Sequence, residues 1–228
     1  MQKMSQNIGQ PIIIENRLGA AGIIGTDQVA KSPADGYTLL VTAYAFTSNP
    51  LLKENLSYQP GSLAPLLLIG TAPSLLYINA KLPPQNLAEV IALAQASPAG
   101  LVLGSSGNGS SAHIAAELFA HAAKIRITHV PYKGIAPLLT DLMGGQIDLA
   151  FLPMAGSIPQ TLIDGKIQGL AVTSKTPHPL FKQFPAMAAM KGLEAMEFDI
   201  WAGVQVRAWF GFGSLGSWGD FMGFWVAL

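Results

Sequence analysis

The sequence of 228 residues contains no cysteine, which excludes disulfide bonds, thiolate metal sites and a cysteine nucleophile. Charge is also scarce: Asp, Glu, Lys and Arg make up 11% of the chain, and thirteen basic residues balance thirteen acidic ones. Proteins that bind nucleic acid usually carry a basic surface, so this balance argues against nucleic acid as the main partner. Half of the residues are hydrophobic, which is enough to fill a core.

Long hydrophobic runs are missing as well. A membrane-spanning helix needs about 18–20 consecutive apolar residues, and the nearest candidate, Leu63–Ile78, is interrupted by Pro65, Gly70 and Pro73. The first ten residues are polar and are not followed by the apolar segment of a secretory signal peptide. These residues therefore predict neither a membrane span nor a cleavable leader.

The histidines do not have the spacing of a metal site. His113 and His121 lie eight residues apart on one predicted helix, whereas a helical ligand pair lies four apart. His129 lies beyond that helix, eight residues after His121, and His178 is distant from all three. We therefore expect no metal ion, and no motif indicates another cofactor.

The most informative stretch is Leu101–Pro137, which reads as strand, polar turn and helix, twice over. The first turn, residues 104–111, consists only of glycine, serine and asparagine, and the periodic apolar residues that follow start a helix at Ser110 or Ser111. Backbone N–H groups and hydroxyls at the positive end of a helix dipole can bind an anion. The alternative is that the turn is rich in glycine and serine only because it is tight. The turn has neither the Gly-Lys-Ser/Thr ending of a P-loop nor the third glycine of a dinucleotide fingerprint.

Strands and helices alternate along the rest of the chain, joined by short connections, which predicts parallel sheets covered by helices. Ligands of such sheets bind beyond the carboxyl ends of the strands. Long apolar Leu66–Ile78 is expected to pass between two sheets. The predicted strands are residues 11–15, 37–43, 63–79, 101–103, 127–130, 147–152, 167–173 and 198–206. The predicted helices are residues 1–8, 26–31, 87–96, 112–123, 137–143 and 157–164, with 181–192 irregular or weakly helical. Polar turns in the expected ligand position are Asn16–Gly25, Ala43–Asn49, Ser105–Ser111 and Pro131–Ala136.

Several motifs in this order resemble the Bug family, the periplasmic solute-binding receptors of tripartite tricarboxylate transporters. They are PIIIENRLGAAGIIGTDQVAKSPADGYTLLV, LVLGSSGNGSSAHIAAELF, ITHVPYKGIAPLLTDLMGGQIDLAF and GLAVTSK, and the resemblance runs from about Gly9 to Trp201. It implies an α/β fold, a two-lobed type II periplasmic binding protein in which each lobe is a mainly parallel sheet flanked by helices and the ligand lies in the cleft between lobes. Lobe 1 would be residues 1–79 plus 200–228, and lobe 2 residues 80–199.

The resemblance also implies a function and partners. The ligand would be a small carboxylate (a dicarboxylate, tricarboxylate, acidic amino acid or aromatic acid), and the partners would be the membrane subunits of a tripartite transporter. We expect a monomer in the periplasm, with no cofactor. The alternatives are a sensor that presents the bound carboxylate to a signalling partner, and a non-functional truncated remnant. An enzyme is not expected, because the GxSxG elbow is absent and Ser110 or Ser111 would have to act with His113 across a helix start.

The resemblance implies that the second lobe contributes the carboxylate loop, Ser105–His113, with the segment Val130–Gly134 beside it. The first lobe would face this loop with Ala43–Thr47, at the end of a strand. Several of these side chains also have an alternative role without a ligand. Lys133 would be a solvated surface lysine, Tyr132 would pack, and His113 would face solvent. Tyr44 and Phe46 would belong to the core, and Arg17 would form a salt bridge. The implied ligand-binding residues are Ser105, Ser106, Gly107, Asn108, Gly109, Ser110, Ser111, His113, Tyr132, Lys133 and Gly134 from lobe 2, with Ala43, Tyr44, Phe46 and Thr47 from lobe 1.

Two departures from the family pattern are expected to matter. The family begins with a leader, a first strand and a proline- and glycine-rich loop that grips the ligand from lobe 1, whereas this sequence starts after them. The end, Arg207–Leu228, holds three of the four tryptophans and four of the ten phenylalanines. We interpret it as the product of a shifted reading frame or a truncated gene, with a membrane-surface segment as the alternative.

Overall fold

The computed structural model describes residues 2–179 and 182–208. The sequence-based expectations for the tail beyond residue 208 and for residues 180–181 lie outside the described residues. The described helices are α1 (Gln2–Ile8), α2 (Ile23–Ala30), α3 (Ala45–Leu52), α4 (Leu87–Ala96), α5 (Ser111–Ala123), α6 (Ile135–Gly144) and α7 (Ile158–Ile163), with short 3-10 turns η1 (Ala20–Gly22), η2 (Pro60–Ser62) and η3 (Met187–Ala189). The described strands are β1 (Leu39–Ala43), β2 (Leu63–Asn79), β3 (Leu101–Ser105), β4 (Ile127–Pro131), β5 (Leu149–Pro153), β6 (Ile167–Val172) and β7 (Asp199–Arg207).

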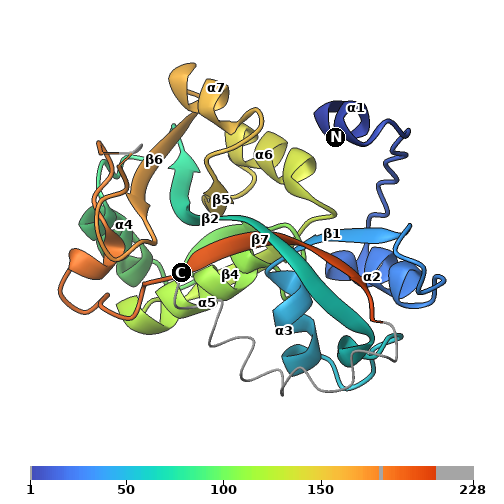
Figure 1. Cartoon of the computed structure of the whole chain (residues 1–228). Coiled ribbons are helices and arrows are strands. Elements are labelled where there is room, and N and C mark those ends of the chain that lie inside the picture. Colours follow the sequence, from blue (N-terminus) through green and yellow to red (C-terminus); the bar gives the residue numbers. More distant parts are fainter. Residues whose placement is uncertain (1, 180–181, 209–228) are drawn as a thin grey trace.

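The long strand β2 connects two sheets (Figure 1). Its first part, up to Pro73, pairs antiparallel with β7, which pairs in turn with β1. From Ser74 onward β2 pairs antiparallel with β5 on one side and β6 on the other. The expectation that this apolar stretch passes between two sheets is confirmed. We call β1, β7 and the start of β2 with their helices the first half, and the remaining strands with α4 to α7 the second half.

The second half has the mixed α/β layout predicted for the fold class. Strand β3 pairs parallel with β4 and with β5. Because β5 and β6 both run antiparallel to β2, the strands β3, β4, β5 and β6 share one direction and only β2 opposes them. In the first half β7 runs opposite to both its neighbours.

Helices cover both faces of the second sheet, and the side-chain alternation along β2 explains why. Successive side chains of a strand point to opposite faces. Leu76 and Ile78 lie in a core with α4 and α5, whereas Leu75 and Tyr77 lie in a second core with α6 and α7. All four are at most 2% exposed, so this part of β2 reads as a continuous apolar run. A third, smaller core fills the first half: Val29, Ala30, Leu40, Phe46, Tyr58 and Leu63.

Two local predictions were wrong. Residues 11–15 form no strand, and Ile13 and Ile14 are exposed, because no neighbouring strand among the described residues pairs with them. The stretch after β1 is not a polar turn but helix α3, in which the hydroxyl of Thr47 donates back to the Tyr44 carbonyl (2.7 Å). No helix in the described part of the chain is long and apolar enough to cross a membrane.

Candidate functional site

Two polar loops lie side by side at the carboxyl ends of β3 and β4. These strands are parallel neighbours, so the loops that follow them open at the same edge of the sheet. The backbone N–H of Tyr132 donates to the Ser105 carbonyl (2.8 Å) and ties the loops together. The predicted polar turns Ser105–Ser111 and Pro131–Ala136 therefore lie beside each other in the fold.

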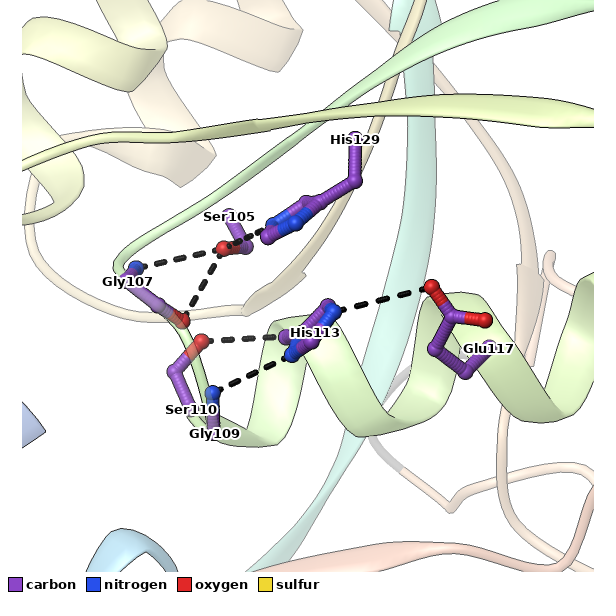
Figure 2. A network of polar contacts seen from close by, with 7 residues as sticks. All are labelled: Ser105, Gly107, Gly109, Ser110, His113, Glu117 and His129. Atoms are coloured by element: carbon purple, nitrogen blue, oxygen red, sulfur yellow. Dashed lines mark hydrogen bonds and ion pairs between the residues drawn. The ribbon is translucent and has the colours of Figure 1, made fainter. Parts of the chain in front are cut away.

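Ser105 braces the first loop from inside (Figure 2). It is fully buried, and its hydroxyl lies 2.6 Å from Nε2 of His129 on β4. The same hydroxyl donates to the Gly107 carbonyl (3.1 Å) and accepts from the Gly107 N–H (3.2 Å). With these contacts, the Ser105 hydroxyl is committed to the loop itself.

The start of α5 is capped by Ser110, as the sequence predicted. Its hydroxyl accepts the N–H of His113 (3.3 Å), the third residue of the helix, and so satisfies one of the unpaired N–H groups at the helix start. Nδ1 of His113 accepts the Gly109 N–H (3.1 Å), while Nε2 lies 3.5 Å from the Glu117 carboxylate (Figure 2). His113 therefore holds the loop in shape instead of facing solvent.

A stacked histidine pair supports the same loop. The rings of His113 and His129 lie 4.0 Å apart and 16° from parallel. Burial lowers the pKa of His129, and the neighbouring His113 lowers it further, while the Glu117 carboxylate acts in the opposite direction. Burial thus favours the neutral form of the His129 ring beside the Ser105 hydroxyl.

Three side chains of the loop are left available. Ser106, Asn108 and Ser111 make no side-chain hydrogen bond within the part of the chain that the structure describes, and Asn108 is exposed. The first N–H groups of α5 also have no partner within the helix. Together they form a set of donors at the positive end of a thirteen-residue helix.

The predicted site residues of the second loop differ in what they contact. The Tyr132 hydroxyl donates to the Asp141 carboxylate on α6 (2.7 Å), and its ring packs against the second core. Burial and the Asp141 carboxylate raise the pKa of Tyr132 to about 12. Tyr132 therefore packs against the core, which is the structural alternative given for this residue. Lys133 is exposed and has no ion pair among the described residues, and Gly134 precedes α6 with a φ of 124°.

The predicted site residues of the first half differ in burial, and some of them belong to a core. Phe46 is 3% exposed and stacks on Tyr58 (6.4 Å between ring centres), so it packs in the small core, which is the alternative given for this residue, and its contact with a ligand stays a prediction. Tyr44 packs edge-on against Phe198 (4.8 Å) and is half-buried. Ala43 ends β1 and is exposed, and Thr47 follows in α3. Arg17 pairs with Glu15 (2.8 Å), which is its structural alternative.

Sequence reasoning missed two residues of this site, Ser48 and His129. The Ser48 hydroxyl donates to the Gly109 carbonyl (2.7 Å), and His129 lies against Ser105 and His113. Ser48 lies within the polar stretch Ala43–Asn49, and His129 lies within the motif ITHVPYKG. Both stretches were recognised in the sequence, so these two residues could have been included in the predicted site. Within residues 2–179 and 182–208, no three His, Asp or Glu side chains converge to hold a metal ion.

The described fold thus combines two sheets joined by the crossing strand β2 with a donor-rich helix start at the edge of the second sheet. The family model described as tripartite tricarboxylate transporter family receptor matches residues 1–208. The chain belongs to this family, as the motifs indicated, and the family consists of receptors and not of enzymes.

Relatives by sequence agree. The UPF0065 protein in the tcbD-tcbE intergenic region of Pseudomonas sp. strain P51 is 34% identical over 204 residues, which is 89% of this chain and 60% of that protein. Protein BugT of Bordetella pertussis is 34% identical over 196 residues, 82% of this chain and 58% of BugT. The chain thus spans about three fifths of the length of these relatives.

Solved structures agree too. Rpa4515 of R. palustris with adipate is 35% identical, with a TM-score of 0.85 over 90% of this chain and 69% of that chain. The periplasmic binding protein BugD is 30% identical, with a TM-score of 0.83 over the same shares. MatC from Rhodopseudomonas palustris with bound malate is 28% identical, with a TM-score of 0.81 over 90% of this chain and 70% of MatC.

Proposed function

We propose that the chain is a periplasmic receptor that binds a small carboxylate at the loop 105–111 and delivers it to the membrane subunits of a tripartite transporter. The single observation that supports it most is the set of donors left available at the start of α5: the side chains of Ser106, Asn108 and Ser111. Adipate and malate, the acids bound to two relatives, are both dicarboxylates.

A carboxylate suits this set of donors. It offers about four lone-pair sites, which N–H groups and hydroxyls can fill without a full opposite charge. The helix dipole of α5 favours the negative charge at its N-terminal end. Lys133, on the turn beside the loop, is the nearby cation that would take a second carboxylate.

We propose that the two lobes have the boundaries stated above, residues 1–79 plus 200–228 and residues 80–199, and close around the ligand. The partner change of β2 between Pro73 and Ser74 supports a division into two bodies joined by this strand, with the crossing a few residues before the proposed boundary at residue 79. Domain closure of this kind is absorbed by a few residues at the crossing.

The test is calorimetric titration of the chain with malate and with adipate, and with adipamide as a neutral control. Ser106→Ala and Ser111→Ala should each weaken acid binding roughly ten- to a hundredfold, because a hydrogen bond to a charged group contributes about 1.5–3 kcal/mol. Ser62→Ala removes a serine hydroxyl that donates to the Gln59 carbonyl within the first half and should bind like the parent. If both loop variants bind an acid as tightly as the parent does, the loop is not the carboxylate site.

A further inference from the structure

Helix α3 belongs to the first half but reaches the loop of the second half. Phe46 anchors the helix in the small core with Leu40 and Leu63. Two residues further on, Ser48 is only 6% exposed, and its hydroxyl donates to the Gly109 carbonyl at 2.7 Å. This is a buried hydrogen bond between residues 61 positions apart.

The bond is a departure from what a serine in a helix usually does. A helical serine hydroxyl usually donates to a carbonyl one turn back in its own helix. For Ser48 that acceptor is Ala45, at 3.4 Å, a longer contact than the one to Gly109. The hydroxyl is therefore directed at the other half of the molecule.

Gly109 is held from both sides. Its carbonyl accepts from Ser48, and its N–H donates to Nδ1 of His113 at 3.1 Å. Its φ is 80°, and a Cβ there would lie 3.1 Å from Cδ1 of Leu52 on α3. The backbone of the loop and α3 thus approach each other closely at a position that favours glycine.

We propose that Ser48 is the latch of the receptor: its hydroxyl bonds the Gly109 carbonyl only when the two halves are together, and so sets how long a bound ligand is retained. The proposal rests on the proposed function for its ligand, but the latch itself is a property of the two halves. An interaction made in one of two states shifts the equilibrium toward that state by its own free energy. His113 acts as a positioning residue, because it fixes the peptide group that the latch engages.

The test compares Ser48→Thr, which keeps the hydroxyl, with Ser48→Val, which has nearly the same shape and no donor. Ser48→Ala is the second donor-free variant, in case the added methyl group of Val disturbs packing, and Ser62→Ala is the control outside the latch. Because the chain has no native cysteine, Tyr37→Cys just before β1 and Ala92→Cys on α4 can carry spin labels without background. Both positions are exposed. Circular dichroism confirms that each variant is folded.

The expected result is that the parent and Ser48→Thr share one distribution of label distances, while Ser48→Val and Ser48→Ala move toward the open distance. Stopped-flow release of malate or adipate should be about three- to tenfold faster in the donor-free variants. Equal distances and release rates for Ser48→Thr and Ser48→Val would overturn the latch. If the parent binds neither acid, the proposed function fails, and the distance distributions without ligand still decide whether Ser48 is a latch.

Discussion

At the scale of single residues, the loop after β3 divides its polar groups between two tasks. Ser105 and Ser110 use their hydroxyls inside the loop, on His129 and on the His113 N–H, whereas Ser106, Asn108 and Ser111 keep theirs available. The sequence indicated the loop and its helix start, because both are local signals. It could not indicate this division, because His129 lies 24 residues away from Ser105 and reaches it only through strand pairing.

His129 makes folding sensitive to pH. Burial and the neighbouring His113 lower the pKa of His129 in the folded chain, whereas in the unfolded chain this pKa has its ordinary value of about 6.5. As the pH falls, the unfolded chain therefore takes up a proton at this histidine before the folded chain does. The contribution of His129 to the free energy of unfolding should therefore be complete above about pH 6.5 and should decrease as the pH falls toward the lowered pKa. His129→Gln should flatten this dependence between about pH 5 and pH 7, measured by urea unfolding.

His121→Gln is the matched control for that measurement, because His121 is exposed on the last turn of α5, away from the stacked pair. It should keep the parent's slope. The same slope in the parent and in His129→Gln would contradict the role given to His129.

At the scale of elements, the predictions that succeeded had strong local signals. Strand β2 has the predicted bounds, and so does α4, whose start is marked by a reciprocal cap: the Asn86 side chain accepts the Glu89 N–H (3.0 Å) and donates to its carboxylate (2.6 Å). The strand predicted at residues 11–15 failed for the opposite reason. Its isoleucines favour extended backbone, but a strand also needs a paired neighbour, which a local pattern does not supply.

The crossing of β2 from one sheet to the other depends on Thr173, at the end of β6. Its hydroxyl accepts the Ser74 N–H (2.9 Å) and contacts the Phe198 carbonyl just before β7. Both Thr173 and Ser74 are buried. Thr173→Val keeps the shape but leaves the Ser74 N–H without a partner, and it should lower the free energy of unfolding by about 1–3 kcal/mol.

Thr173→Ser retains the hydroxyl and serves as the control in the same urea titration. It should lie much closer to the parent than Thr173→Val does. Equal stability of the two variants would show that the hydroxyl does not fasten the crossing.

At the scale of the whole molecule, the two halves are connected by the crossing of β2 (Figure 1) and by the hydrogen bond from Ser48 on α3 to the Gly109 carbonyl in the loop before α5. The sequence motifs predicted the first of these, because a long apolar strand between two sets of βα units has few other arrangements. The family resemblance placed residues 43–47 opposite the loop, but it indicated neither the helix α3 nor the hydrogen bond of Ser48 to Gly109, because these depend on how the halves meet. A carboxylate bound at the loop would lie at this meeting point, which is why binding and closure are coupled in the proposed receptor.

The central claim, that this chain binds a small carboxylate, is tested most directly by its thermal unfolding in the presence of acids. Succinate, malate, adipate, citrate and glutamate form the panel, and the corresponding neutral amides are the controls. A ligand that binds only the folded state at a hundred times its Kd stabilises that state by about 2.7 kcal/mol, which raises the Tm of a chain this size by roughly 5–10 °C. The account predicts one cooperative transition that at least one acid raises and its amide does not. A cooperative transition that no acid shifts more than its amide would contradict it.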